Sequence, residues 1–342
     1  MIGGKIFYVE TNYQFLVSLS IIFSEEPNLD CNVTLIDATE EGLFFLNKDL
    51  LENKFGFSVI SLPRRSFYVE VLTAFFKAPN LYNTLDGSFL YIFNNRSPIV
   101  NRLSSLFMPT NVSIVEEGLS LYRKSNDTKG FRLFRFNVKK AIISCLTNSQ
   151  YTDIIGRTKY ASTLYLKYPD SYSNRNYYHI KKLQPLSILN EFSNELASIF
   201  NCDLDIPKEC GDRVAIFFGQ PLSELGIVDR CVELNNIKML HEVLYSKGIT
   251  LLIKPHPIDT NGKYDGISEY VLPSSVPSEV MLATMEATVD SIFTYYSTAA
   301  INASVSLDIP AYFLLDILDV KSIEVIVPPE VNAVFLKDLL EI

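Results

Sequence analysis

The sequence lacks several features by which common protein classes are recognised. Its 342 residues include no tryptophan and three histidines, and they contain neither a Gly-x-Gly-x-x-Gly fingerprint nor a Walker phosphate loop. The five cysteines are scattered, odd in number and without a pair at zinc-ligand spacing. We therefore expect no structural zinc, no disulfide framework and a reducing, cytoplasmic location.

Basic residues and long apolar runs are also scarce. Lysine and arginine number 30 against 39 aspartates and glutamates, and the resulting net charge of −9 argues against a general nucleic-acid-binding role. No uncharged apolar stretch is long enough to span a bilayer. Glu10 and Asn12 interrupt the first apolar run, which argues against a signal peptide. His179, placed in a loop, and His241 lack metal-ligand spacing, so we expect no metal.

What the sequence does contain is an alternation of short apolar runs with helical segments, typical of an α/β fold with mostly parallel sheets. We expect two Rossmann-like domains that face a central cleft. The boundaries are 1–200 for the first domain and 201–328 for the second, with a C-terminal helix at 329–342 that packs back on the first. Expected elements include helices at 67–76 and 183–200 and a short strand at 269–272.

The most informative stretch is Ile249–Pro257, ITLLIKPHP. Its apolar, β-branched start predicts a strand buried on both faces, and two prolines then end the strand because neither can donate a backbone N–H. His256 is thereby placed on a stiff loop at the carboxyl end of a strand, where open α/β sheets bind ligands. The alternative is a strand-ending turn that happens to contain a histidine.

Other strand ends in the second half carry groups that a nucleotide could use. The residues are Gly219 and Gln220 after one strand, Lys254 and Pro257 around His256, Glu279 at the start of a short helix, and Ser297 and Thr298 where a strand turns into a helix. The glycine would allow close approach of a ligand, and the hydroxyls with the helix N–H groups would form a phosphate site. For Glu279, Ser297 and Thr298 the alternative is a purely structural role, in which they stabilise or cap a helix N-terminus.

In the first half, Glu116-Glu117-Gly118 follows a predicted strand. Paired carboxylates beside an apolar sheet suit a general base, whereas the alternative is a charged turn. Asp203-Leu204-Asp205 has the Asp-x-Asp form of metal-dependent sugar transferases, but it lies in the predicted linker and we interpret it as solvated.

The segment 123–140 interleaves lysines and arginines with phenylalanines and other apolar residues. It predicts either a peripheral contact with an anionic membrane on its inner face, or a helix whose basic side chains cover apolar neighbours. The second interpretation is slightly favoured because the pattern is not cleanly amphipathic.

Taken together, these motifs resemble those of bacterial sialyltransferases. Glu116-Glu117-Gly118 resembles their acidic-acidic-Gly motif, Lys254-Pro255-His256-Pro257 their His-Pro motif, and Ser297-Thr298 their paired hydroxyls, with Pro277-Ser278-Glu279 similar to a Pro-x-Glu element. The turn Thr11-Asn12-Tyr13-Gln14 resembles that of glycosyltransferase family 52, apart from Asn12 where proline is usual. The polysialyltransferase and multifunctional marine sialyltransferase families share the same set.

The resemblance implies a GT-B fold, CMP-sialic acid as donor, inversion at the anomeric carbon and neither metal nor other cofactor. It implies that Glu116 is the general base, with Glu117 next and Asp229 and Glu233 in reserve, and that His256 hydrogen-bonds or protonates the leaving phosphate. Donor-binding residues would be Gly219, Gln220, Lys254, Pro257, Glu279, Ser297 and Thr298. The acceptor would be a hydroxyl, such as that of a terminal galactoside, on a lipooligosaccharide, O-antigen or capsule repeat.

Three other functions remain open at this point. A transferase of another CMP-linked acid sugar, such as Kdo, would carry a similar His-Pro element. A nucleotide-sugar epimerase also uses two Rossmann-like halves but would bind a UDP-sugar. A non-catalytic glycan-binding or assembly protein would tolerate a decayed site, which the intact motifs argue against. The acceptor, the linkage and the oligomeric state, including a homodimer, are not determined.

Overall fold

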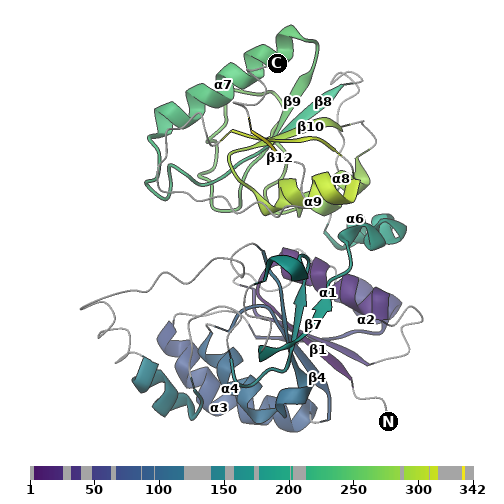
Figure 1. Cartoon of the computed structure of the whole chain (residues 1–342), viewed down its shortest axis with the longest axis vertical. Helices are drawn as coiled ribbons and strands as arrows, with labels where there is room; N and C mark the ends of the chain where they lie inside the picture. Colours follow the sequence, from purple (N-terminus) through teal and green to yellow (C-terminus); the bar gives the residue numbers. More distant parts are fainter. Residues whose placement is uncertain are drawn as a thin grey trace. The chain divides into compact units, whose positions relative to one another are not determined.

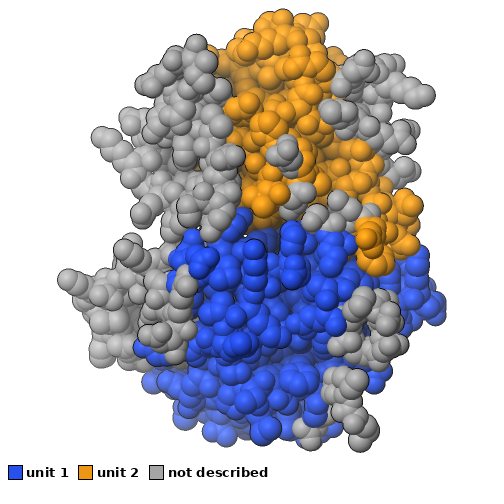
Figure 2. All heavy atoms as spheres, turned by 45° about the vertical axis from the view of Figure 1, so that its right-hand side comes forward, with its two compact units in different colours: residues 1–188 blue, residues 189–342 orange. Residues whose placement is uncertain are grey.

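The structure is a computed structural model that describes residues 4–25, 32–39, 48–62, 67–85, 87–95, 97–118, 140–150, 158–172, 177–200, 202, 213–285, 289–307, 309–314 and 333–335. The chain divides into two compact units, unit 1 from Met1 to Ile188 and unit 2 from Leu189 to Ile342 (Figure 2). The predicted boundary at residue 200 differs from this division. The helix α6 (Ser193–Ile199) belongs to unit 2, where it packs against α8 (Ser278–Thr284).

Unit 1 contains a seven-stranded sheet in the order β3-β2-β1-β4-β5-β6-β7, and every described strand pair is parallel. The strands are β1 (Lys5–Val9), β2 (Val33–Asp37), β3 (Ser58–Ser61), β4 (Phe89–Ile92), β5 (Val112–Val115), β6 (Thr163–Leu166) and β7 (His179–Lys182). The first six positions follow the Rossmann order 3-2-1-4-5-6, in which the order of strands reverses between β1 and β4. His179 therefore begins an edge strand and does not lie in a loop, a correction that its pairing with β6 explains.

The helices of unit 1 cover both faces of its sheet. Figure 1 shows α1 (Asn12–Glu25) and α2 (Lys48–Phe55) on one face, and α3 (Phe67–Leu85) and α4 (Pro98–Leu106) on the other. Thr11 caps α1, because its Oγ1 accepts the backbone N–H of Gln14 at 3.2 Å. The α3 helix continues well past the predicted end at Phe76, with Pro79 inside it. Pro79 removes one backbone hydrogen bond of the helix, and α3 packs extensively against α4.

Unit 2 contains a five-stranded sheet in the order β12-β11-β10-β8-β9, again with parallel described pairs. The strands are β8 (Val214–Phe218), β9 (Thr250–Lys254), β10 (Val289–Thr294), β11 (Ala311–Phe313) and β12 (Ala333–Phe335). The strand predicted at 269–272 is reduced to one parallel bridge between Val271 and Ile253 of β9. If the bridge at Val271 is counted as the third strand of unit 2, the order is bridge-β9-β8-β10-β11-β12. This is the same 3-2-1-4-5-6 order, and the order of strands reverses between β8 and β10.

The C-terminal helix predicted at 329–342 is wrong where the structure describes the chain. Residues 333–335 form β12, which pairs in parallel with β11, and the rest of the predicted helix lies outside the described residues. An added strand satisfies the backbone groups of the neighbouring strand, a gain that a local helical pattern cannot reveal.

The core of unit 2 explains why the Ile249–Ile253 run could be recognised from its sequence. All five residues of β8 are buried, and so are Leu251, Leu252 and Ile253 of β9. Figure 1 shows α7 (Arg230–Ser246) on one face of the sheet and α8 and α9 (Thr298–Leu307) on the other. Burying each large apolar side chain contributes about 1.5–3 kcal/mol, so this sheet is a stable base for the loops at its edge.

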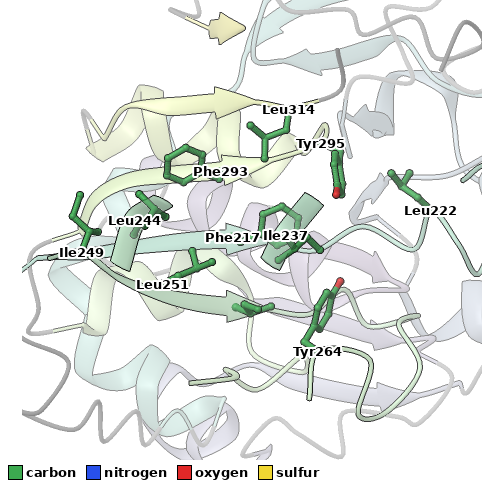
Figure 3. Close-up of a cluster of buried hydrophobic side chains, with 12 residues drawn as sticks. Phe217, Leu222, Ile237, Leu244, Ile249, Leu251, Tyr264, Phe293, Tyr295 and Leu314 are labelled. Carbon is green, nitrogen blue, oxygen red and sulfur yellow. The ribbon is translucent and has the colours of Figure 1, made fainter. Parts of the chain in front are cut away.

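Figure 3 shows the cluster between the sheet and α7, with Tyr264, Tyr295 and Leu222 at the end toward which the strands point. These residues carry the apolar core directly to the carboxyl ends of β8, β9 and β10. None of the described helices is long and apolar enough to cross a membrane.

Candidate functional site

The residues with predicted donor-binding roles gather at the carboxyl edge of the unit 2 sheet. Phe218 of β8 lies beside Lys254 of β9, and the backbone N–H of Gly219 donates to the Lys254 carbonyl oxygen at 2.8 Å. The loop after β9 that carries His256 is thus next to the loop after β8. Because the strand order reverses between β8 and β10, this edge is where an open α/β sheet leaves room for a ligand.

Lys254 is a nearly buried cation at this edge. The residue is only 5% exposed, and its Nζ donates to the carbonyl oxygens of Ser274 at 3.0 Å and Pro255 at 3.4 Å. Burial lowers the lysine pKa to about 8, against the opposing effects of Glu279 and Asp259. A bound anion would compensate this charge better than two carbonyl oxygens do.

The ring of His256 is held in one orientation by its own loop. The backbone N–H of Ile258 donates to Nδ1 at 3.1 Å, so a neutral imidazole carries its proton on Nε2. Within the described residues, no hydrogen bond involves Nε2. Burial lowers the pKa of His256, and Lys254 and Lys263 add to this effect while Asp259 and Glu224 oppose it. The ring is therefore neutral at pH 7 and presents a fixed N–H donor.

Gly219 is required by a contact within the protein and not by φ. A Cβ at this position would lie 2.5 Å from Tyr264 Oη, 2.9 Å from Asp259 Oδ2 and 3.3 Å from the His256 backbone nitrogen. The expectation from the sequence is close approach of a ligand. The structure instead shows close approach of the loop that follows His256, and the neighbouring Gln220 is buried beneath the same loop and accepts from Lys263 through its carbonyl oxygen.

A buried ion cluster lies behind this loop. The Nζ of Lys263 donates to Glu224 Oε2 at 2.8 Å, Glu233 Oε1 at 2.9 Å and Asp259 Oδ1 at 2.9 Å. The lysine side chain is 0% exposed, as is that of Glu233. Burial alone would lower the pKa of Lys263, but the hydrogen bonds from the three carboxylates outweigh it and raise the pKa. Burial likewise opposes ionisation of Glu224, yet Lys263 and Thr260 hold its pKa at about 2.

The remaining predicted donor residues lie on the helix side of the edge. Glu279, in the first turn of α8, accepts from Asn302 Nδ2 of α9 at 2.9 Å. Ser297 caps α9, since its Oγ accepts the Ala299 N–H at 3.2 Å, and Thr298 is the first residue of that helix. Pro257 is exposed beside His256. Among the described residues, no hydrogen bond joins Ser297 or Thr298 to His256, so the structure relates them only through the shared edge.

In unit 1, the acidic pair follows β5 as expected. Glu116 is fully buried, and its Oε2 accepts the backbone N–H of Lys167 at 2.6 Å, while its own N–H donates to the Tyr165 carbonyl oxygen at 3.0 Å. These bonds orient the carboxylate at the end of β5, beside the end of β6. Glu117 is partly exposed.

The reserve carboxylates have structural partners. Asp229 caps α7 by accepting the Cys231 N–H at 2.7 Å, and Glu233 binds Lys263 and the Ser223 N–H. In the part of the chain that the structure describes, no group of three or more histidine, cysteine or acidic residues is placed to hold a metal ion. Asp203 and Asp205 lie outside the described residues, and so does the segment 123–140 apart from Lys140.

Sequence reasoning did not identify Asp259, Lys263, Tyr264 and Glu224. One available signal was the spacing: Asp259 lies three residues after His256, where a carboxylate can accept that residue's N–H, and Lys263 lies four residues further on. Glu224 comes from the loop after β8, and no local pattern connects it to the loop after β9.

Comparison with solved structures identifies the fold. The UDP-GlcNAc 2-epimerase from Methanocaldococcus jannaschii superposes with a TM-score of 0.54 and 12% identity, over 92% of this chain and 84% of that chain. The enzyme from Neisseria meningitidis bound to UDP-GlcNAc gives a TM-score of 0.52 and 10% identity, over 91% of this chain and 82% of that chain. Such identities establish the fold alone, and it is the GT-B type.

Sequence comparison identifies the family. No curated protein matches the chain in sequence. A family model, described as alpha-2,8-polysialyltransferase, matches residues 17–316, which include the acidic pair, the His-Pro element and the paired hydroxyls. The match supports a sialyltransferase type of glycosyltransferase, and it does not single out family 52, the other family considered. The chain belongs to the alpha-2,8-polysialyltransferase family.

Proposed function

We propose that the protein transfers sialic acid from CMP-sialic acid to a hydroxyl group of a bacterial surface glycan, with inversion and without a metal ion. The observation that supports this most directly is the fixed Nε2–H donor of His256 beside the buried cation of Lys254, in a chain of the polysialyltransferase family. An N–H donor and a cation at one sheet edge suit the phosphate and carboxylate groups of such a donor sugar.

The transfer breaks the bond between the anomeric carbon and the phosphate oxygen of CMP, and it forms a bond from that carbon to the acceptor oxygen. Negative charge grows on the departing phosphate. A donor that is already oriented stabilises this charge without reorganising at the moment of reaction. Since burial lowers the pKa of His256, the ring acts in this proposal as a neutral hydrogen-bond donor, and CMP leaves as the anion without taking the imidazole proton.

The proton of the acceptor hydroxyl needs a base, and we assign this role to Glu116. The backbone N–H of Lys167 orients its carboxylate, and a base that is held in one orientation loses less entropy in the transition state. Glu117 is the second candidate. Both glutamates belong to unit 1, whereas the residues proposed to bind CMP-sialic acid belong to unit 2.

For the basic, aromatic segment 123–140 both interpretations stay open, a peripheral contact with an anionic membrane and basic side chains that cover apolar neighbours; binding to anionic vesicles at low salt distinguishes them. A Kdo-type donor remains an alternative substrate, since its transfer would use the same phosphate and carboxylate contacts. The epimerase alternative is supported only by the shared fold, and the family match favours the transferase.

The first prediction tests the nucleotide. CMP should raise the melting temperature of the protein, and UDP at the same concentration should raise it less; at 100 times the dissociation constant the gain is about 2.7 kcal/mol. Incubation with CMP-sialic acid and a panel of sialylated and galactosyl acceptors, with and without a chelator, should give sialylated product in both conditions. Stabilisation by UDP alone, with no transfer, would favour the epimerase.

The second prediction concerns His256. Replacing it with alanine should reduce kcat by about 10²–10³-fold, because one donor to the developing charge is lost. His256→Gln should retain more activity than His256→Ala, since an amide N–H can serve as a neutral donor. His241→Ala, on α7 of the same unit, is the matched control and should leave kcat unchanged. A rate that falls as pH rises through the histidine pKa would contradict the neutral-donor role and indicate a general acid.

The third prediction uses the lowered pKa of Lys254. An anion beside this lysine favours its protonated form, so affinity for CMP should be highest below pH 8 and should fall as pH rises through about 8. Because one proton is involved, the affinity for CMP can fall by at most about tenfold per pH unit. Calorimetric titration between about pH 7 and pH 10 measures it. Lys254→Met should remove the pH dependence, and the exposed control Lys238→Met should retain it.

The fourth prediction separates the two carboxylates. Glu116→Gln should reduce kcat by about 10²–10⁴-fold and leave the KM for CMP-sialic acid nearly unchanged, because a base is needed for the chemical step and not for donor binding. Glu117→Gln should have the smaller effect. The reverse order, measured in the same steady-state assay, would assign the base to Glu117.

A further inference from the structure

The loop that carries His256 is anchored by one carboxylate, that of Asp259. Its Oδ2 accepts the His256 backbone N–H at 2.8 Å and the Tyr264 hydroxyl at 2.8 Å, and its Oδ1 accepts Lys263 Nζ at 2.9 Å. The aspartate side chain is 1% exposed. Both oxygens are therefore engaged by protein donors, and the carboxylate is screened from solvent.

The same short segment determines where the imidazole points. The Asp259 N–H donates to the His256 carbonyl oxygen at 2.9 Å, which closes a turn over residues 256–259. Inside that turn the Ile258 N–H donates to Nδ1 of the ring. Because Asp259 holds the backbone at both ends of the turn, a shift of its carboxylate would move the amide that orients the ring.

Lys263 fixes Asp259 in turn. Its ammonium is also bound by Glu224 from the loop after β8 and by Glu233 from α7, so the turn is attached to two elements outside its own loop. Three donors surround the Asp259 carboxylate, and a carboxylate can accept from all of them. An asparagine would have to point its NH₂ group at one of these donors, so the negative charge is needed as well as the shape.

We propose that Asp259, held by Lys263, is the positioning residue for His256: it keeps the Nε2–H directed at the leaving phosphate without touching the substrate. This inference rests on the transfer proposed above, but its structural part concerns the free protein. The charged groups that act on the ring are Asp259, Glu224, Lys254 and Lys263. Loss of the aspartate charge removes an effect that opposes the lowering of the His256 pKa.

The experiment compares Asp259→Asn with Asp265→Asn, a matched substitution in the same loop at an exposed aspartate. Long-range ¹⁵N–¹H spectra of the histidine rings report the tautomer directly, and the chain has only three histidines, so His256→Gln assigns the signal. In the wild type and in Asp265→Asn we expect the Nε2–H tautomer. In Asp259→Asn we expect a mixture of tautomers and a lower His256 pKa.

The kinetic expectation follows from the geometry. A displacement of about 1 Å at a reacting group can reduce the rate by about 10²-fold, so Asp259→Asn should reduce kcat by that order. The KM for CMP-sialic acid should change much less when it is measured well below the Lys254 pKa of about 8, because loss of the Asp259 charge lowers that pKa further and would weaken donor binding at higher pH. A purely structural role would lower the melting temperature and the folded fraction, but it would leave the ring tautomer and the kcat of the folded protein unchanged.

Tyr264→Phe serves if Asp259→Asn does not fold. It keeps all charges and removes only the hydroxyl that donates to Oδ2. We expect the same changes but smaller ones, with kcat reduced about tenfold for the loss of one hydrogen bond to a carboxylate. A wild-type ring signal together with a wild-type kcat in the folded variant would overturn the proposal.

The two proposals fail separately. If the wild type transfers no sialic acid but Asp259→Asn or Tyr264→Phe changes the His256 ring signal, the transfer assignment is wrong and the positioning role stands. If the wild type is active and neither variant changes the ring signal or kcat, the positioning role is wrong and the transfer assignment stands.

Discussion

The interaction on which the unit 2 site depends is the contact of the buried Lys263 ammonium with three carboxylates. A buried ammonium without partners would cost several kcal/mol, and so would each buried carboxylate. Removing any one of the four groups therefore leaves a buried charge without full compensation. Their sources are the loop after β8, the helix α7 and the loop after β9. One charge cluster thus joins the elements that surround His256, and it does so below the surface, where salt and water screen it little.

The cluster also explains why the edge residues occupy their positions. Gly219 has no side chain because Tyr264 and Asp259 occupy the space where a Cβ would be. Behind it, the core of Phe217, Tyr264 and Tyr295 extends to the ends of the strands, and Tyr295 donates to the Glu233 carbonyl oxygen at 3.1 Å. A rigid apolar base and a saturated polar layer together leave His256 and Lys254 as the groups that can respond to a ligand.

The fold and the family carry different information about function. The same GT-B architecture is found in UDP-GlcNAc 2-epimerases at about one residue in ten identical, so the architecture does not select the chemistry. The distinguishing groups are a few side chains at strand ends, and their order along the chain is what resembles the sialyltransferases. In the free protein Ser297 caps α9 and Glu279 accepts from Asn302, so a ligand at this edge would have to compete with these protein partners for the same hydroxyl and carboxylate.

The sequence by itself determined the parallel α/β class, the buried β8 and β9 strands, and the strand-end location of His256, Lys254 and Glu116. These features are local: apolar runs, prolines and glycines act over a few residues. Only the tertiary structure decided that residues 333–335 add a strand, that His179 lies on an edge strand, and that Asp259, Lys263, Glu224 and Glu233 form one cluster. Backbone pairing and charge compensation join residues far apart in the chain, and their free energy exists only once the sheet has brought those residues together.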